Sequence, residues 1–271
     1  MSADEEKTIY LLGKNVPSRL HGLAAPLTGV NQIHEAVQAA EAAADWVTLD
    51  QQSAEALLKQ SFMHMMARPD HQLGNLLLQE PPSLASIAVA QQAFSAVAWT
   101  NSRKGWLPLA ELLEVLHAPN RANLLIGGMV DPHTHTLTVY RGDSSQVTVP
   151  LSVFKRTADG GAPVFNDFRV IDYGHAVRFG RYESATDAIL YEGDPAYRRS
   201  VNARRRAEER TFGASLRRLR SQRRLRQSDF PGVAARTIIR IENGEIDNPH
   251  TETLGLIAKR LGVRPNAIGT Y

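Results

Sequence analysis

The stretch FGASLRRLRSQRRLRQSDFPGVAARTIIRIENGEIDNPHTETLGLIAKRLGV, from Phe212 to Val263, decides how the end of this chain folds. Its apolar residues recur at steps of three and four, the spacing that places side chains on one face of a helix. Arginines occupy many of the positions between them. The pattern therefore predicts a compact set of short helices with a basic surface. The apolar positions that define the first and last of these helices are Leu216, Leu219, Leu254, Ile257, Ala258 and Leu261.

Two further helices are expected between those. One opens at Leu225 and Gln227 and stops at a Pro231-Gly232 turn, and the other runs through Thr237–Glu242. Phe230 precedes a proline, which disfavours helical backbone. We therefore expect the earlier of these two helices to be as short as a single turn.

The stretch resembles the Cro and phage-repressor (XRE-type) helix-turn-helix family over residues 212–263, through the ordered motifs F-G-x-x-L-R-x-L-R, L-x-Q, G-V, T-I-x-R-I-E-N-G and P-x-x-x-T-L-x-x-I-A-x-x-L-G-V. The resemblance implies an all-α DNA-binding domain at 212–271, with a recognition helix near 234–241 that lies in the major groove. A helical bundle whose arginines only solvate one face is the alternative, which a lone L-R-x-L-R would suit. The full ordered set favours the DNA reader.

Two features depart from the family pattern. The segment between Gln227 and the Gly-Val pair is shorter than the family's second helix, and Ala234 stands where the family has a Ser or Thr N-cap. Losing such a cap typically costs about 1 kcal/mol. These departures leave the docking angle of the recognition helix open.

The resemblance also implies roles for single residues. Arg220 and Glu242 match a buried ion pair that ties the first helix to the end of the third, and Ile238 and Ile241 match core positions. Gln227 and the Asn243-Gly244 turn match positions that contact phosphate. The candidate DNA-binding residues are Gln227, Ala235, Arg236, Thr237, Ile239, Arg240, Asn243, Arg223 and Arg224.

The arginines divide into two groups. Arg236 and Arg240 lie four residues apart and so share one face of the recognition helix. Either guanidinium can donate two hydrogen bonds to guanine O6 and N7 in the major groove. Arg217, Arg218, Arg223 and Arg224 are expected to contact phosphates, which adds affinity without sequence preference.

The distribution of charge supports the same location for a nucleic-acid partner. From Arg198 to the end the chain has 17 Lys and Arg against 7 Asp and Glu, a net charge of +10. The rest of the chain carries −7, which would repel DNA phosphates. Residues 196–211 form a basic linker, for which a solvated role and direct phosphate contact are both open.

Composition bounds the remaining possibilities. The 271 residues suggest about two domains. The chain has no cysteine, which excludes disulfides, thiolate zinc sites and cysteine nucleophiles. Its first residues, MSADEEKTIYLLG, are not a secretory signal, and Ser83–Trp99 is short and polar for a membrane span. A cytoplasmic protein with no membrane contact is expected.

The overall prediction is an α+β multidomain protein. Residues 1–120 are expected to be a mostly helical domain, a possible dimerisation or effector region, with one short strand at Trp46–Leu49. Residues 121–195 are expected to be a small α+β domain with two β-hairpins, and they loosely resemble a small bacterial domain family of unknown function found with such regulators. The helices predicted in the first domain are Asn31–Asp45, Gln51–Met66, Ser83–Ala98 and Leu107–His117.

Two sequence features raise the question of a metal. Gly127–His135 resembles the first metal motif of amidohydrolases, but only His175 and His250 follow it, so we expect a turn between two strands. Phe62–Met66 is methionine-rich, and a core or interface segment is favoured over a soft-metal site. We expect no catalytic residues, no metal and no cofactor.

The sequence thus predicts a transcriptional regulator without enzymatic activity, which as a homodimer binds double-stranded DNA at a palindromic operator. An antitoxin-type autoregulator is the alternative, with a partner protein bound to the N-terminal region. A metal hydrolase fused to a DNA-binding module is a third and weaker reading.

Overall fold

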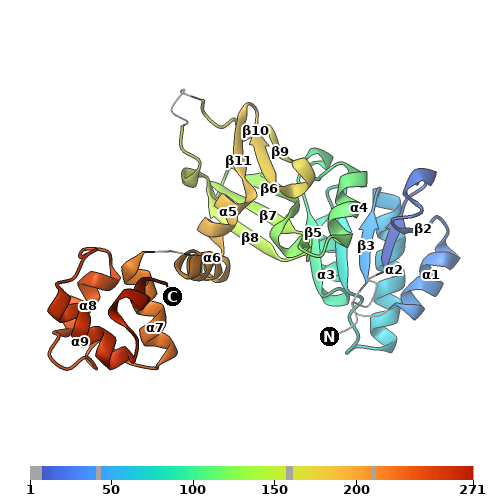
Figure 1. Cartoon of the computed structure of the whole chain (residues 1–271). Coiled ribbons are helices and arrows are strands. Elements are labelled where there is room, and N and C mark those ends of the chain that lie inside the picture. The colour runs from blue at the N-terminus through green and yellow to red at the C-terminus, as the bar shows by residue number, and fades with distance from the viewer. Residues whose placement is uncertain (1–7, 41–43, 157–160, 209–210, 271) are drawn as a thin grey trace. The chain divides into compact units, whose positions relative to one another are not determined.

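A computed structural model describes residues 8–40, 44–156, 161–208 and 211–270. The chain divides into two compact units, residues 1–194 and 195–271 (Figure 1). The predicted domains 1–120 and 121–195 lie together in the first unit. The predicted linker falls at the start of the second unit, where it begins as helix.

The first half of the first unit is built on a parallel sheet. Its strand order is β2-β1-β3-β4-β5, with every neighbouring pair parallel. This is one of the common doubly wound orders. The strands form because short apolar runs such as IYLL and LLL are buried on both faces of the sheet. Their bounds are β1 Ile9–Leu12, β2 Ala25–Leu27, β3 Asp45–Thr48, β4 Asn75–Leu78 and β5 Ala96–Trp99.

Three helices connect these strands and a fourth follows them. Helix α2 packs against both α1 and α3. The Asp50 side chain caps α2 by accepting a hydrogen bond from the Ser53 N–H at 2.8 Å, and burial between sheet and helices includes Trp46, Leu57 and Phe94. The helix bounds are α1 Val30–Ala39, α2 Gln51–Ala67, α3 Leu84–Ala93 and α4 Leu109–His117.

A helix therefore lies at each of the four positions predicted in the N-terminal region, but the parallel sheet on which the region is built was not predicted. The helices expected at Gln51–Met66 and Leu107–His117 are confirmed, and so is the strand near Trp46. The helix expected over Ser83–Ala98 ends at Ala93, however, and the chain turns into β5. An apolar run of four residues fits a buried strand and a buried helix equally well, so periodicity could not separate them.

Two antiparallel sheets make up the second half of this unit. One has the order β6-β7-β8 and the other β11-β10-β9, so both predicted hairpins are confirmed. The Trp106 indole N–H donates to the Leu78 carbonyl at 3.1 Å, which joins this half to the parallel sheet. The bounds are β6 Leu125–Asp131, β7 Thr136–Arg141, β8 Gln146–Pro150, β9 Phe168–Ile171, β10 Ala176–Phe179, β11 Tyr182–Ala185 and α5 Thr186–Gly193.

The segment from Asp131 to His135 is the turn between β6 and β7, as expected. The Asp131 carboxylate accepts the backbone N–H of His133 at 2.8 Å, which commits it to the turn. His133 and His135 are exposed. Among the residues that the structure describes, no three His, Asp or Glu side chains gather closely enough to hold a metal ion.

The methionine-rich segment lies on α2. Met63 and Met66 are 62% and 65% exposed, which excludes the core alternative for them. His64 is buried instead, and its Nε2 lies 3.3 Å from Nδ1 of His71. Burial lowers the pKa of His64, and the positive charges of His71 and Arg68 lower it further.

The second unit is all α. Its core collects apolar side chains from three helices and from the segment between the first two of them, and it includes Leu216, Phe230, Ile238, Ile241 and Ile257. No helix in the described part of either unit is long and apolar enough to cross a membrane. The bounds are α6 Pro195–Glu208, α7 Phe212–Gln222, α8 Ala235–Glu242 and α9 Thr251–Leu261, followed by the 3-10 helix η6 Pro265–Thr270.

The second helix expected to open at Leu225 and Gln227 is absent, because residues 223–234 form turns. Arg224 and Gly232 both have left-handed backbone, with φ of 55° and 79°, which interrupts a helix at each end of the segment. The Asp229 carboxylate accepts the Arg226 N–H at 2.7 Å, closing a local turn. The segment is held in place by Phe230, which is 2% exposed.

Candidate nucleic-acid interface

Helix α8 separates an apolar face from a basic one. Ile238 and Ile241 are fully buried, as expected for core positions. On the opposite side Arg236 and Arg240 are exposed, and Ile239 is 38% exposed between them. The two buried isoleucines are three residues apart and the two exposed arginines are four apart. Residues at either spacing lie on the same face of a helix.

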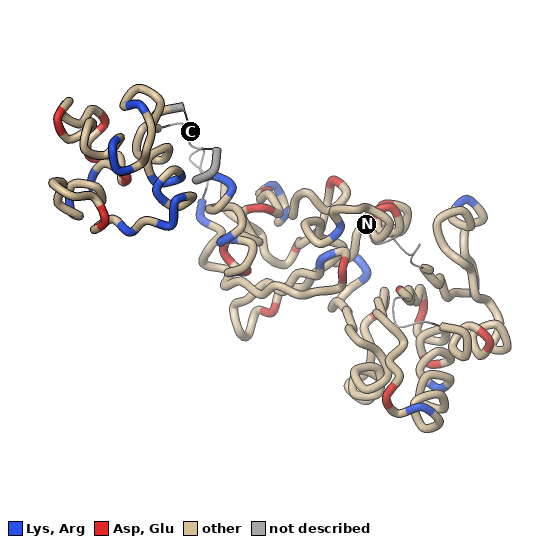
Figure 2. The backbone as a smooth tube through the Cα atoms, turned by 60° about the horizontal axis from the view of Figure 1, so that its bottom comes forward, with Lys and Arg blue, Asp and Glu red and all other residues tan. Residues whose placement is uncertain are grey.

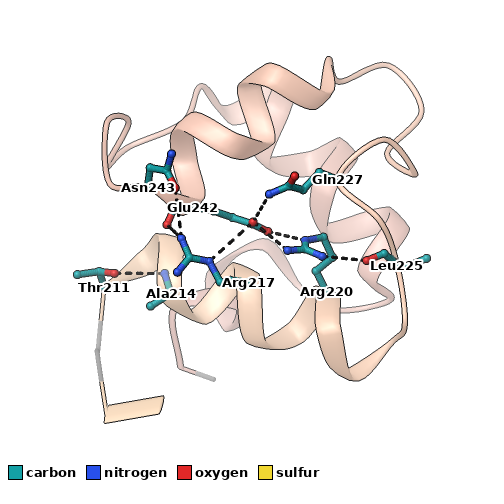
Figure 3. Close-up of polar contacts among 8 residues, drawn as sticks. All are labelled: Thr211, Ala214, Arg217, Arg220, Leu225, Gln227, Glu242 and Asn243. Atoms are coloured by element: carbon teal, nitrogen blue, oxygen red, sulfur yellow. Dashed lines mark hydrogen bonds and ion pairs between the residues drawn. The ribbon is translucent and has the colours of Figure 1, made fainter. Parts of the chain in front are cut away.

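The end of α8 is fixed to α7 by Glu242, whose side chain is 1% exposed (Figure 3). Its two carboxylate oxygens accept hydrogen bonds from Nε and Nη2 of Arg220, at 2.6 and 2.9 Å. This two-pronged geometry is the strong form of an arginine–carboxylate contact. The pair expected between Arg220 and Glu242 is therefore present.

Two further side chains join this cluster. The Gln227 amide donates to Glu242 at 2.8 Å, so it faces inward rather than toward a partner. Arg217 donates to the main-chain carbonyl of Glu242 and, at 3.4 Å, to the Asn243 side chain (Figure 3). Arg217 was expected to contact phosphate and instead holds the C-terminal end of α8. The exposed Asn243 is the point where this cluster reaches the surface.

A glycine sets how closely α7 and α8 approach. A β-carbon added at Gly213 would lie 2.1 Å from the main-chain oxygen of Ile241, far inside contact distance. Only a residue without a side chain therefore fits at this position. The sequence motif contains this glycine in its F-G pair, so the position could be identified from the resemblance. Helical periodicity alone gives no reason for a glycine at this position.

The remaining candidate residues differ in how available they are. Arg223 and Arg224 are exposed directly after α7, and neither they nor Arg236 form an ion pair within the described part of the chain. Arg240 pairs with Glu245 at 3.1 Å, with both side chains about half exposed. Such a surface pair is weak and can be exchanged for another anion. Ala235 and Thr237 are half buried and lie at the start of α8.

Helix α8 starts without a side-chain cap. Ala234 has the extended backbone of an N-cap residue, with φ −64° and ψ 139°, but no group to accept the free N–H bonds. The N-terminal end of α8 thus exposes unpaired N–H groups and the positive end of the helix dipole. Both features favour an anion at this position.

Positive charge is dense along the second unit. Figure 2 shows Lys and Arg at many places along the second unit, and by sequence they lie on α6, on α7 and after it, and on α8. Arg204 and Arg205 on α6 are exposed, so the predicted basic linker has cations at its surface. The candidate interface is therefore a helix with two outward arginines, anchored to α7 through Glu242, in a unit that carries further exposed cations.

Comparisons of the chain with models of known protein families, with curated proteins and with solved structures found no match to any of them.

Proposed function

We propose that this protein is a sequence-specific DNA-binding regulator of transcription and that α8 is its recognition helix. The observation that carries the proposal is the division of α8 into two faces. One face presents Arg236, Ile239 and Arg240 outward, and the other is anchored by Glu242 to α7. A groove-reading helix needs both, because exposed side chains read bases only when the helix behind them is fixed.

The outward side chains match what the major groove offers. Arg236 and Arg240 can each donate two hydrogen bonds to one guanine, and the apolar surface of Ile239 suits the methyl group of thymine. Arg223 and Arg224 supply phosphate contacts that set position and affinity without reading sequence. A regulator of this kind acts in the cytoplasm. The second unit is similar to the XRE-type helix-turn-helix family in its Arg220–Glu242 pair and in the core positions Ile238 and Ile241. It differs from the family in the missing second helix and in the uncapped start of α8 at Ala234.

The test separates base reading from phosphate binding. A preferred duplex is selected from random DNA with the full chain, and binding to it and to a scrambled duplex is measured by fluorescence anisotropy at several salt concentrations. Arg236→Ala is expected to weaken binding to the selected duplex by roughly 1–3 kcal/mol and to relax preference at one base pair.

Arg224→Ala is expected to weaken binding to both duplexes alike and to lower the salt slope by about one phosphate contact. Arg181→Ala, an exposed arginine of the first unit, is the matched control and should change neither quantity. Equal losses on both duplexes for Arg236→Ala and Arg240→Ala would show that α8 does not read bases.

A further inference from the structure

The first unit contains a cavity of about 420 Å³. It lies where β6, the residues before β9 and the turn at Asn101–Gly105 come together. Pockets that bind small organic molecules have volumes of roughly 300–1,000 Å³, so this cavity is large enough for a compact ligand. None of the DNA-binding candidates belongs to it.

The cavity wall is mostly apolar. It is lined by Met129, Val130, Leu151, Phe165 and Phe168, and the first two and Phe165 are half buried. Behind the wall, Phe165 and Phe168 both pack against the ring of Phe179, with centroids 5.3 and 5.5 Å away. Aromatic packing of this kind holds the wall in place.

The back of the cavity is closed by main chain. A β-carbon at Gly105 would lie 2.5 Å from the main-chain oxygen of Gly128, and both residues line the cavity. The two segments can therefore not approach further, and side chains cannot fill the space from this side. The cavity is thus a feature of the backbone arrangement.

The cavity lining includes one lysine and one aspartate, and only the aspartate has an ion-pair partner in the described part of the chain. Lys104 is the one Lys or Arg among the lining residues, all of which are described, and it forms no ion pair with a described residue. Asp167 is the one carboxylate, and it accepts hydrogen bonds from Nε and Nη2 of Arg169, both at 3.3 Å. A cation is left available at the rim of an apolar cavity.

We propose that this cavity binds a small, mainly apolar carboxylic acid. Its apolar body packs on Met129, Phe165 and Phe168, and its carboxylate pairs with Lys104. The apolar contact supplies most of the binding free energy, and the ammonium group selects an acid over its neutral analogue. The site is a candidate effector site, but its ligand binding does not depend on the DNA-binding proposal.

The methionine methyl groups provide a located readout. The chain has 5 methionines, of which Met129 lines the cavity while Met63 and Met66 are exposed on α2. The full chain, labelled with ¹³C at the methionine methyls, is titrated with naphthalene-2-carboxylate and separately with its neutral analogue naphthalene-2-carboxamide. Met129→Leu assigns the relevant signal.

The Met129 signal is expected to shift saturably with the carboxylate, while the Met63 and Met66 signals stay fixed. The carboxamide should bind more weakly. Lys104→Met should raise the Kd of the carboxylate about 1.5- to fivefold, the range of a solvent-exposed ion pair, and leave that of the carboxamide unchanged. The matched control Lys59→Met, at an exposed position on α2, should change neither Kd.

Three results would overturn the proposal: no movement of the Met129 signal with either probe, equal affinity for the two probes, or a carboxylate Kd that Lys104→Met does not change. The introduced methionine at position 104 gives a sixth signal, whose movement with the carboxamide reports that this variant retains the cavity. DNA binding enters none of these measurements, so its failure would leave the site intact.

Discussion

At the scale of single residues, Glu242 is the buried carboxylate that joins α7 to the end of α8 in the second unit. A buried carboxylate is costly unless its oxygens are paired, because desolvation of the charge opposes folding. Here Arg220 donates to both oxygens and Gln227 donates to one of them, at distances between 2.6 and 2.9 Å. The cluster therefore fixes the direction of α8 more than it adds net stability, and removing any single partner leaves a charge or an amide unpaired.

Ala234 offers a gain of stability. Ser at this N-cap can accept an N–H of the first turn of α8 with the backbone already in the extended conformation. Ala234→Ser is expected to stabilise α8 by about 1 kcal/mol, seen as roughly fivefold slower amide hydrogen exchange in that helix. Ala203→Ser, in the interior of α6 at an exposed position, has no N–H to cap and should slow no exchange. Unchanged exchange in Ala234→Ser would mean that the added hydroxyl does not cap α8.

His64 makes the first unit sensitive to acid. Burial, with the charges of His71 and Arg68, lowers its pKa below the ordinary 6.5. As the pH drops below about 6.5, the unfolded chain takes up a proton on His64 while the folded unit still holds this side chain neutral. The free energy of unfolding therefore falls with the pH in this range. Urea midpoints at pH 7.5 and 5.5 measure this through tryptophan fluorescence, because Trp46, Trp99 and Trp106 all lie in the first unit.

His64→Gln is expected to reduce the difference between the two midpoints, since the side chain no longer titrates. The exposed His21→Gln serves as the control and should leave that difference as it is in the unaltered chain. A difference that survives in His64→Gln would assign the acid sensitivity to other groups.

At the scale of elements, helices were predicted better than strands. Gln51–Ala67 is long enough for several turns of apolar periodicity to appear, whereas β1, β4 and β5 are four-residue runs without an alternating pattern. Strands buried on both faces lose the alternation that identifies a strand. The parallel sheet therefore could not be derived from periodicity. The hairpin of β7 and β8 could, because buried and more exposed residues alternate along its strands.

The candidate site shows the same division. Ile238, Ile241 and the Arg220–Glu242 pair were predictable because the family resemblance implied their roles. The absence of a helix at 223–234 was only half predictable. Phe230 precedes a proline, and this predicted a shortened helix. The left-handed backbone at Arg224 could not be predicted, because arginine rarely adopts that conformation. The inward orientation of Arg217 depends on this packing and could not be read from the sequence.

The contact between α7 and α8 can be tested with two glycines. Gly213→Ala places a methyl group 2.1 Å from the Ile241 oxygen, so the helices must separate. We expect a loss of about 1–3 kcal/mol, the usual cost of overpacking, and weaker DNA binding. Gly255→Ala on α9 meets nothing within 4 Å and should stabilise by roughly 1 kcal/mol through helix propensity.

Amide hydrogen exchange in α7, α8 and α9 measures both changes in the full chain. The two variants make the same chemical change in the same unit. If Gly213→Ala lowers the stability and Gly255→Ala raises it, the contact between α7 and α8 is the cause of the difference. A neutral or stabilising Gly213→Ala would mean that α7 and α8 are further apart than described.

At the scale of the whole molecule, the two units carry opposite charge. The net charge of +10 in the C-terminal part favours a polyanion such as the proposed DNA partner, and the net charge of −7 in the rest disfavours one. The first unit is thus suited to contacts other than with phosphate, including the cavity and self-association. This asymmetry was visible in the sequence, although the boundary at residue 194 required the structure.

The last prediction is that the protein acts as a homodimer. Helix α8 has 8 residues, a length of about 12 Å at 1.5 Å per residue, so one copy reads only a few base pairs. Two copies related by a two-fold axis would read half-sites about one helical turn apart and so reach the selectivity a regulator needs. Light scattering at micromolar concentration is expected to give about twice the chain mass of 29.9 kDa for the free protein, and that mass plus the mass of the duplex on DNA.

A pair of DNA duplexes extends this test, because the spacing of half-sites is a geometric quantity. A palindrome with half-sites 10–10.5 base pairs apart, centre to centre, should bind cooperatively. Inserting about half a helical turn, roughly 5 base pairs, places the half-sites on opposite faces of the duplex, which a rigid dimer cannot span. The inserted duplex keeps every base contact and phosphate, so it is the matched control for sequence reading. Equal binding to both duplexes, together with a monomeric mass on and off DNA, would mean that one copy of α8 reads its site alone.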